Sequence, residues 1–397
     1  MSTHGDAAPA DSGRSDGLDE SPGGSPGGSP GGSPDESSQD GITTLLQLSL
    51  DELKERVQAM GGKPFQAKII RRNVLEKGRL DYAGMTDLPI TLRDRLEVEL
   101  PIFSSTLVDE VRARDGTTKI LLSFPLGKAR GGGATSRDLS VETVHMPPLP
   151  HVREDAEGNE RGATLCVSSQ AGCPVGCPFC ASGLLGLARN LEAHEIVEQY
   201  VRGRAIGPLR RSVVMGIGEP LLNYENLNAA LTVVRDEMGL GGRKLTVSTV
   251  GFPDRLRKIA LQDPKFQLAI SLHTPDQDQR DHLVPAMRGV PIEEILAAGD
   301  FWFETTGREI TYEYVLLGGD NDSLGHAQRL AERLHGRRCS VNIIPYNPTP
   351  DLPFGRPDTG RAEAFRDALI EGGLIATIRW SRGLDSAAAC GQLRLSR

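Results

Sequence analysis

The stretch Thr164-Leu-Cys-Val-Ser-Ser-Gln-Ala-Gly-Cys-Pro-Val-Gly-Cys-Pro-Phe-Cys180 decides the fold of this 397-residue chain. Its apolar start predicts a β-strand, and its end places Cys173, Cys177 and Cys180 in a CxxxCxxC array. Two prolines and a glycine between the cysteines restrict and shape the loop. Three thiolates this close in sequence can hold one cubic iron–sulfur cluster, because a tight loop reaches several of its corners. The array supplies three ligands, so one iron of a four-iron cluster would stay open.

Zinc is the alternative occupant of such an array. A structural zinc site needs four ligands and typically joins one CxxC pair to a second pair or to two histidines. No second CxxC and no HxxxH pattern follows, and the nearest downstream histidine, His194, fits the polar face of a helix. The sequence therefore favours an iron–sulfur cluster. A zinc-stabilised RNA-binding protein without catalysis stays open as an alternative from a different class.

The cysteine count and the hydropathy pattern indicate the compartment. The chain has six cysteines, whereas a secreted disulfide framework is typically a short chain dense in cysteine. No apolar run approaches the roughly 20 residues that cross a bilayer, and the N-terminus lacks a basic stretch followed by an apolar core. We expect a cytoplasmic protein with no membrane partner, in which the cysteine cluster serves metal binding or redox chemistry.

The net charge of −8 says little about nucleic acid, because an N-terminal tail carries most of it. Residues 1–41 hold eight acidic side chains against one basic, Arg14, and repeat Ser-Pro-Gly-Gly three times from Ser21. Such a segment buries almost nothing and cannot offset the entropy of ordering, so we expect it to be disordered. Without it the chain is close to neutral, which neither supports nor excludes an RNA partner.

The remaining chain divides by its pattern into three parts. Residues 42–103 show helical periodicity and predict a small accessory domain. Residues 104–150 predict a β extension or linker with strands at Thr106–Val111, Thr118–Phe124 and Ser140–His145. Basic side chains gather in the helical part, where they could bind phosphates or be merely solvated. They are Lys63, Lys68, Arg71, Arg72, Lys77 and Arg79.

Residues 151–397 alternate apolar strand-like runs with helical stretches, which predicts a parallel sheet with crossover helices. The expected strands are Ala163–Ser168, Ser212–Ile217, Lys244–Thr249, Gln267–Leu272, Ile310–Leu317, Cys339–Pro345 and Leu374–Trp380. The expected helices lie near 192–205, 225–237, 254–262, 291–305, 323–335 and 360–372. We therefore predict an α/β fold, a partial (β/α)6 barrel of the TIM type, with functional residues at the carboxyl ends of its strands.

CxxxCxxC with an aromatic residue before the last cysteine resembles the signature of the radical S-adenosylmethionine (SAM) superfamily. The flanking motifs narrow the resemblance: residues 164–172, Met215-Gly-Ile-Gly-Glu-Pro-Leu-Leu-Asn223 and Ala388-Ala-Cys-Gly-Gln392. Together with Gly62-Lys-Pro-Phe-Gln-Ala67 and Met85-Thr-Asp-Leu88, they are similar to the dual-specificity RNA methyltransferases that methylate C2 of an adenine in 23S rRNA and in certain tRNAs. The resemblance spans about residues 43–395 and implies that the helical domain binds RNA. It also implies a [4Fe-4S] cluster on the three cysteines.

The resemblance implies a ping-pong mechanism through cysteine. Cys390 would accept a methyl group from a first SAM, and a radical formed from a second SAM would activate that methyl group for addition to the ring carbon. Cys166 would resolve the adduct by attacking the sulfur of Cys390, a thiol–disulfide step. Glu142 matches the proton-transfer carboxylate of the family, although the resemblance leaves open whether Glu142 or Cys166 takes the ring proton. Cys339 lies in no motif, and we expect it in the core.

The same resemblance implies the SAM contacts, all of them near predicted strand ends. The implied residues are Gly218, Glu219, Ser248, Ser271, Leu272, His273 and Asn347. Ile217 and Val250 depart from the family pattern, which usually has Met and Ser there. The implied partners are 23S rRNA, tRNA and a low-potential electron donor, and we expect a monomer.

Two further alternatives stay open from the residues. The related Cfr-type enzymes share most of these motifs and methylate C8 of the same rRNA adenine, and no residue separates the two products by physics. A radical SAM enzyme acting on a small molecule is the other alternative. The basic segment between Lys63 and Arg79 and the two accessory cysteines argue against it.

Overall fold

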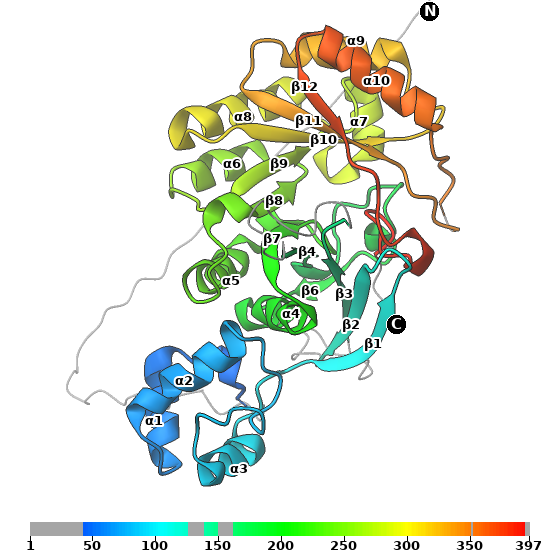
Figure 1. The fold of residues 1–397 in the computed structure, drawn as a ribbon. Helices are drawn as coiled ribbons and strands as arrows, with labels where there is room; N and C mark the ends of the chain where they lie inside the picture. Colours follow the sequence, from blue (N-terminus) through cyan, green and yellow to red (C-terminus); the bar gives the residue numbers. More distant parts are fainter. Residues whose placement is uncertain (1–42, 126–138, 150–161, 351, 394–397) are drawn as a thin grey trace, which may run out of the picture. The chain divides into compact units, whose positions relative to one another are not determined.

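The computed structural model describes residues 43–125, 139–149, 162–350 and 352–393, and Figure 1 shows their fold. The acidic tail at residues 1–41, where the sequence predicts disorder, lies outside this part, and so do residues 150–161. Within the described ranges, no helix is both long and apolar enough to span a membrane.

The N-terminal part of the described chain is helical. It comprises a 3₁₀ turn at Leu45–Gln47 and the helices α1 (Leu50–Ala59), α2 (Pro64–Leu75) and α3 (Ile90–Glu99). A capping box starts α1: the Ser49 hydroxyl accepts from the Glu52 amide, and the Glu52 carboxylate accepts from the Ser49 amide. The helices pack through buried aliphatic side chains, including Leu53, Val57, Ile70, Val74, Leu92 and Leu96.

One basic residue of this helical part has an internal role. Arg71 donates from Nε and Nη2 to the two carboxylate oxygens of Glu237, at 2.7 and 2.6 Å, and from Nη1 to the carbonyl of Leu48. A forked guanidinium–carboxylate pair of this kind fixes geometry as well as charge. Arg71 therefore ties α2 to the segment after α5 (Tyr224–Asp236), and its side chain is committed within the fold.

A single ten-stranded sheet forms the rest of the framework, in the order β1-β2-β3-β4-β7-β8-β9-β10-β11-β12. The first three strands, β1 (Thr106–Arg112), β2 (Thr118–Phe124) and β3 (Leu139–Met146), are an antiparallel extension. From β4 onward the strands are parallel, and β3 pairs antiparallel with β4 at Val144–Cys166. The extension therefore continues the sheet directly from the strand that precedes the cluster motif.

The parallel strands and the helices between them form the predicted partial barrel (Figure 1). The strands are β4 (Ala163–Cys166), β7 (Leu209–Val214), β8 (Leu245–Thr249), β9 (Gln267–Ser271), β10 (Ile310–Leu316), β11 (Cys339–Pro345) and β12 (Ile375–Ile378). The helices are α4 (Ala193–Ile206), α5, α6 (Pro253–Ala260), α7 (Gln277–Leu283), α8 (Ile292–Thr306), α9 (Leu324–Leu334) and α10 (Thr359–Glu371). In the described sheet β12 is an edge and does not pair with β4, so the barrel is not closed.

The α/β barrel prediction is confirmed, with differences at strand ends and in short elements. The strand predicted at Ser212–Ile217 is β7, Leu209–Val214, because Gly216 and Ile217 leave the ladder and donate to the Val167 carbonyl and the Ser168 hydroxyl. Three elements were not predicted: the hairpin of β5 (Gln170–Gly172) with β6 (Leu187–Asn190), and helix α7. Such short segments carry too few residues for a periodic signal.

Candidate active site

The three motif cysteines lie in a loop that the β5–β6 hairpin encloses. The amide of Cys173 donates to the Gly186 carbonyl at 3.1 Å, and the amide of Cys180 donates to the Cys177 carbonyl at 3.1 Å. Gly172 has a φ of +81°, and a Cβ there would lie 2.0 Å from the Gly186 carbonyl oxygen, so only glycine fits this crossing. Cys173, Cys177 and Cys180 all line one cavity of about 160 Å³, which we call the cofactor cavity.

The chemistry of this donor set fits an iron–sulfur cluster. Burial raises the pKa of Cys173 to about 12 and also raises the pKa values of Cys177 and Cys180. Backbone amides oppose the shift: those of Val175 and Gly218 face Cys173, and Ser182 and Gly183 offer theirs to Cys180. Amides directed at sulfur are what stabilises cluster-bound thiolates. Among the described residues, no group of three His, Cys, Asp or Glu side chains is placed to hold a single metal ion.

The motif Met215–Asn223 places its backbone against the cofactor cavity. Gly218 has a φ of +111°, and a Cβ there would lie 2.6 Å from Gln170 Cβ, so a side chain would collide with the hairpin. Glu219 follows, buried, and its carboxylate accepts from Thr249 Oγ1 at 2.6 Å and from the amides of Val250 and Leu221. Burial raises the pKa of Glu219, and these donors oppose it. Gly218 and Glu219 both line the cavity, as expected.

A row of polar side chains crosses the barrel interior on successive strands. Ser248 Oγ and Ser271 Oγ lie 3.3 Å apart on β8 and β9. On β10, the register partner of Ser271 is Glu313, whose Oε1 accepts from Asn342 Nδ2 of β11 at 3.0 Å. Ser248, Ser271 and Glu313 line the cofactor cavity. Two of the SAM contacts that the resemblance implies therefore belong to a longer row, which Glu313 extends.

Glu313 was not predicted from the sequence, although its position is notable. The residue is 3% exposed, and its Oε2 has no hydrogen-bond partner in the described structure. Arg379 Nη1 lies 3.6 Å from its Oε1. Burial raises the pKa of Glu313 and Arg379 opposes the rise. A buried carboxylate oxygen without a donor is costly, so a ligand donor is its natural complement. In the sequence, a single Glu within a strand gives no such signal.

His273 and Leu272 follow β9 and differ in their relation to the cofactor cavity. His273 lines the cavity with a φ of +65°, and its Nδ1 accepts from the Val315 amide at 3.1 Å. Burial lowers its pKa to about 3, so the ring stays neutral. Leu272 is fully buried and is not among the lining residues, and its carbonyl accepts from Arg280 Nη1 at 2.6 Å. Arg280 of α7, also missed from the sequence, holds the ends of β8 and β9 through their carbonyls.

The segment that carries Cys390 is fastened to the cluster loop. The Ala181 amide donates to the Gly391 carbonyl at 2.8 Å, and Ser182 Oγ donates to the Leu393 carbonyl at 2.7 Å. Asn347 Nδ2 donates to the carbonyl of Cys390 at 3.0 Å. Asn347 lines the cavity as expected, but the hydrogen bonds of its side chain go to Cys390 and, through Oδ1, to Arg356.

Cys390 and Cys166 both line a second cavity of about 360 Å³, which we call the outer cavity. Burial raises the pKa of Cys166 to about 12, and the neighbouring Cys390 adds to this. The pKa of Cys390 is also raised by desolvation, with Arg379 opposing. Cys390 lines both cavities, whereas Cys166 lines only the outer one. All six cysteines are free in the structure, so the disulfide expected during catalysis is not present here. Cys339, which we expected in the core, begins β11 and is partly buried, packed against the core at its margin.

Glu142 lies on β3, two residues before Val144, the register partner of Cys166. It is buried, and its Oε1 lies 2.8 Å from Nζ of Lys119. Its carbonyl accepts from the Ser168 hydroxyl at 2.7 Å. Val144, two residues further along β3, pairs with Cys166 and lines the outer cavity. Because side chains alternate along a strand, Glu142 leaves the same face as Val144, although Glu142 is not itself among the described lining residues.

Comparison with known proteins places this arrangement in a class. The radical SAM superfamily model matches residues 167–331, which include the cluster loop and most of the barrel. A crystal structure of a radical SAM methyltransferase from Sphaerobacter thermophilus superposes with a TM-score of 0.76 at 41% identity, covering 88% of this chain and 99% of that one. The fold and the site thus define a radical SAM methyltransferase.

The family within that class is shown by matches that span most of the chain. Residues 43–102 match the model of the ribosomal RNA large subunit methyltransferase N-terminal domain. Proteins named probable dual-specificity RNA methyltransferase RlmN are 42% identical over 359 residues in Rhodopirellula baltica and 41% identical over 360 residues in Nostoc punctiforme. These alignments cover 89% and 90% of this chain and 91% and 94% of the relatives. The chain belongs to the RlmN family, and it is an enzyme whose cofactors are a [4Fe-4S] cluster and SAM.

Proposed function

We propose that this enzyme methylates C2 of an adenine in 23S rRNA, and of an adenine in tRNA, by way of a methyl group carried on Cys390. The observation that supports this most directly is the position of Cys390, which lines both cavities. One cavity contains the three cluster cysteines and the other contains Cys166. A methyl carrier has to receive its group on one side and deliver it on the other.

Cys173, Cys177 and Cys180 would hold the cluster, and the residues around the cofactor cavity would hold SAM. The proposed SAM contacts are Gly218, Glu219, Ser248, Ser271, Leu272, His273 and Asn347. When bound, the cluster and SAM supply the 5′-deoxyadenosyl radical that makes an unactivated C–H bond reactive. His273 stays neutral beside them, since burial holds its pKa far below neutral pH.

Cys390 and Cys166 divide the remaining steps. With SAM bound, Cys390 Sγ would act as the nucleophile towards its methyl carbon, an ordinary displacement in which the sulfonium carbon–sulfur bond breaks as the carbon–Sγ bond forms. Cys390 would then hold that carbon against the adenine ring, whose sp² carbon is a poor nucleophile for a direct polar transfer. Cys166 Sγ would attack the Cys390 sulfur of the adduct, so that a Cys166–Cys390 disulfide forms as the bond from Cys390 Sγ to the transferred carbon breaks. That carbon takes the electron pair and a proton and leaves as the new methyl group of the RNA. Glu142, on the same face of β3 as Val144, is the proposed proton-transfer group.

Several partners complete the proposal. A low-potential electron donor is required by the cluster chemistry, and the cytoplasm is the compartment that keeps the six cysteines reduced. We propose that the chain acts as a monomer. We also propose that residues 42–103 form an RNA-binding domain, residues 104–150 an extension and residues 151–397 the catalytic core.

The decisive test is mass spectrometry of the peptide that contains Cys390, from protein purified out of cells that assemble its cluster. We expect one added methyl on Cys390, absent in Cys390→Ala, together with 2-methyladenine in RNA treated with the wild-type enzyme. Unmodified Cys390 in cluster-loaded protein exposed to SAM would contradict the carrier role. An 8-methyl product would instead support the Cfr-type alternative, which the RlmN relatives do not favour.

A further inference from the structure

We propose that the outer cavity is the subsite for the target nucleotide of single-stranded RNA, with Trp380 as a stacking surface for a base and Arg210 and Arg211 as phosphate ligands. This inference rests on the proposed function and deepens it, because it assigns the substrate side of the site. It starts from the difference between the two cavities that meet at Cys390.

The outer cavity lies where the barrel is not closed. One wall comes from β3, β4 and β7, and the other from residues 379–382 after β12. The two cavities share Met215, Ile344 and Cys390. Because the cluster cysteines line the cofactor cavity, SAM belongs there, and the outer cavity is the remaining route to Cys390.

The charge of the outer cavity matches a phosphate backbone. Its described lining includes four arginines, Arg210, Arg211, Arg379 and Arg382, and no carboxylate. The cofactor cavity, by contrast, is lined by Glu219 and Glu313 and by no arginine. A strictly cationic cavity suits an anionic polymer and does not suit a peptide of mixed charge.

The four arginines differ in whether the fold already uses them. Arg379 lies 3.6 Å from Glu313, and Arg382 donates to the carbonyl of Asp115 at 2.9 Å. The side chains of Arg210 and Arg211 are exposed and make no ion pair or hydrogen bond within the described part of the chain. A guanidinium without a protein partner can bind phosphate in a forked geometry without first breaking a contact.

The register of the strands sets the spacing between phosphate and reacting carbon. Arg211 pairs with Thr164, and Val213 pairs with Cys166. Arg211 therefore lies two residues along β7 from the level of Cys166, a rise of about 7 Å. A base beside Cys166 and Cys390 would then have its backbone within reach of Arg211, which is a long side chain.

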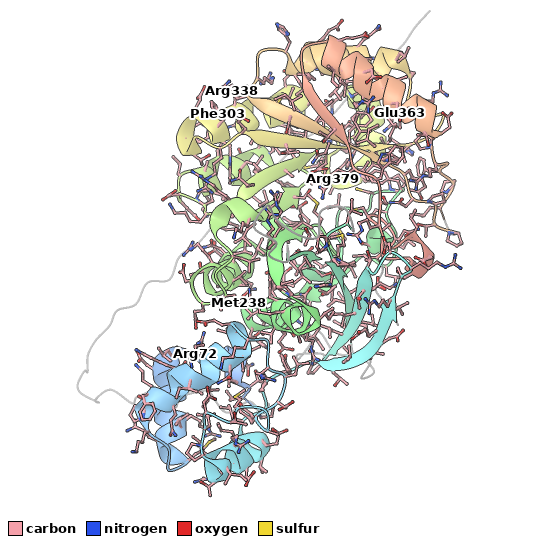
Figure 2. The ribbon with its side chains drawn as sticks, viewed as in Figure 1. Arg72, Met238, Phe303, Arg338, Glu363 and Arg379 are labelled. Carbon is pink, nitrogen blue, oxygen red and sulfur yellow. The ribbon has the colours of Figure 1, made fainter. Side chains whose placement is uncertain are left out.

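Trp380 supplies the aromatic surface. It is 46% exposed, lines the outer cavity and has no aromatic partner within the described residues. Arg379 precedes it, at the end of β12, and is labelled in Figure 2. Stacking of an unpaired base on a tryptophan strengthens binding and depends little on the base sequence. An exposed tryptophan beside the carrier cysteine is thus suited to hold a base removed from its helix.

The test compares cluster-loaded, full-length variants for RNA binding and for transfer from methylated Cys390. The variants are Trp380→Ala, Trp380→Phe and the double variant Arg210→Gln/Arg211→Gln. The matched control is Arg243→Gln/Lys244→Gln, an adjacent basic pair that is exposed at the start of β8, outside the cavity. The probe is a short single-stranded RNA that carries the target adenine, and the readouts are its Kd across salt concentrations, its KM and the fraction of Cys390 methylated.

We expect Trp380→Ala to raise the KM for RNA about tenfold and Trp380→Phe to recover most of the loss. In the double arginine variant, the slope of log Kd against log salt should fall by about 1–2 relative to the control pair. Variants that match the control pair, while the wild type methylates RNA, would overturn the subsite and leave the proposed function standing. Loss of Cys390 methylation in Trp380→Ala would assign the cavity to SAM and also overturn it. A wild type that methylates no RNA would overturn both.

Discussion

The two cavities that meet at Cys390 differ in whether their polar side chains are already paired within the protein. In the cofactor cavity the polar groups largely satisfy one another: Glu219 accepts three hydrogen bonds, and Ser248 and Ser271 lie within contact of each other. In the outer cavity Arg210 and Arg211 are exposed and Trp380 is half exposed. A small cofactor of constant shape is best served by a prearranged, buried site. A large and exchangeable polymer is served by groups that keep their binding capacity free.

The largest expected effect tests whether the cofactor cavity functions independently of RNA binding in the outer cavity. Cys177→Ala removes a cluster ligand, so we expect loss of bound iron and a fall in RNA methylation of about 10³-fold or more. RNA binding should stay within about twofold of wild type, because the outer cavity is untouched. Iron analysis, methylation assays and filter binding measure the three quantities. Cys339→Ala, at the other end of β11, is the matched control. If Cys177→Ala also loses RNA affinity, the two cavities are not independent.

An intermediate effect is expected at Asn347, which connects the cofactor cavity to the segment that carries Cys390. Asn347→Ala removes the hydrogen bond to the Cys390 carbonyl, and such a bond contributes about 1 kcal/mol. We expect the rate of Cys390 methylation to fall about tenfold, since small displacements of a reacting group are costly. The Kd of SAM should rise by a smaller factor, because Asn347 is also a proposed SAM contact. Equilibrium binding of SAM and timed mass spectrometry separate the two quantities. A loss of SAM affinity as large as the loss of rate would show that the bond of Asn347 to Cys390 does not contribute to the reaction.

The smallest expected effect on activity concerns β3, which forms one wall of the outer cavity, because the change there is in folding stability. Burial lowers the pKa of His145 on β3 to about 4, and Arg112 and Arg382 contribute. In the unfolded chain the imidazole of His145 takes up a proton near pH 6.5, whereas in the folded protein it does so only near pH 4. The buried neutral ring therefore costs no stability above pH 6.5, and the free energy of unfolding falls as the pH drops from 6.5 towards 4. His145→Phe should reduce the difference in unfolding free energy between pH 7 and pH 5 by about 2 kcal/mol.

Denaturant unfolding at the two pH values measures this difference, with the exposed His335→Gln as control. A pH dependence that is the same in His145→Phe and in the wild type would show that His145 is readily protonated in the folded protein. In that case the wall of the outer cavity is wetter than the structure indicates.

The barrel was predictable because its strands are long apolar runs separated by amphipathic helices, and period alone distinguishes them. The β5–β6 hairpin was not, because strands of three and four residues carry almost no pattern. The end of β7 was also displaced from its expected position, since Gly216 and Ile217 continue the apolar run while their amides bond elsewhere.

Within the site, residues that belong to contiguous motifs could be found and isolated ones could not. Cys173, Cys177, Cys180 and Cys390 lie in dense local patterns. Glu313, Arg280 and Trp380 lie in ordinary sequence surroundings. Only the tertiary structure brings Glu313 and Trp380 to the cavities and Arg280 to the carbonyls at the ends of β8 and β9. Asn347 illustrates a further limit: its place in the cavity was predicted, but its bond to the backbone of Cys390 requires tertiary structure.

The barrel is open because β12 is an edge of the described sheet and does not pair with β4, and this opening bears on which RNAs the enzyme can methylate. A closed barrel would admit a nucleotide only through the mouth at the carboxyl ends of its strands. A wall open along one side lets a loop of RNA enter sideways, present one base and withdraw by the same route. The length of the substrate and the distance of the target from either end then place no topological restriction on the reaction.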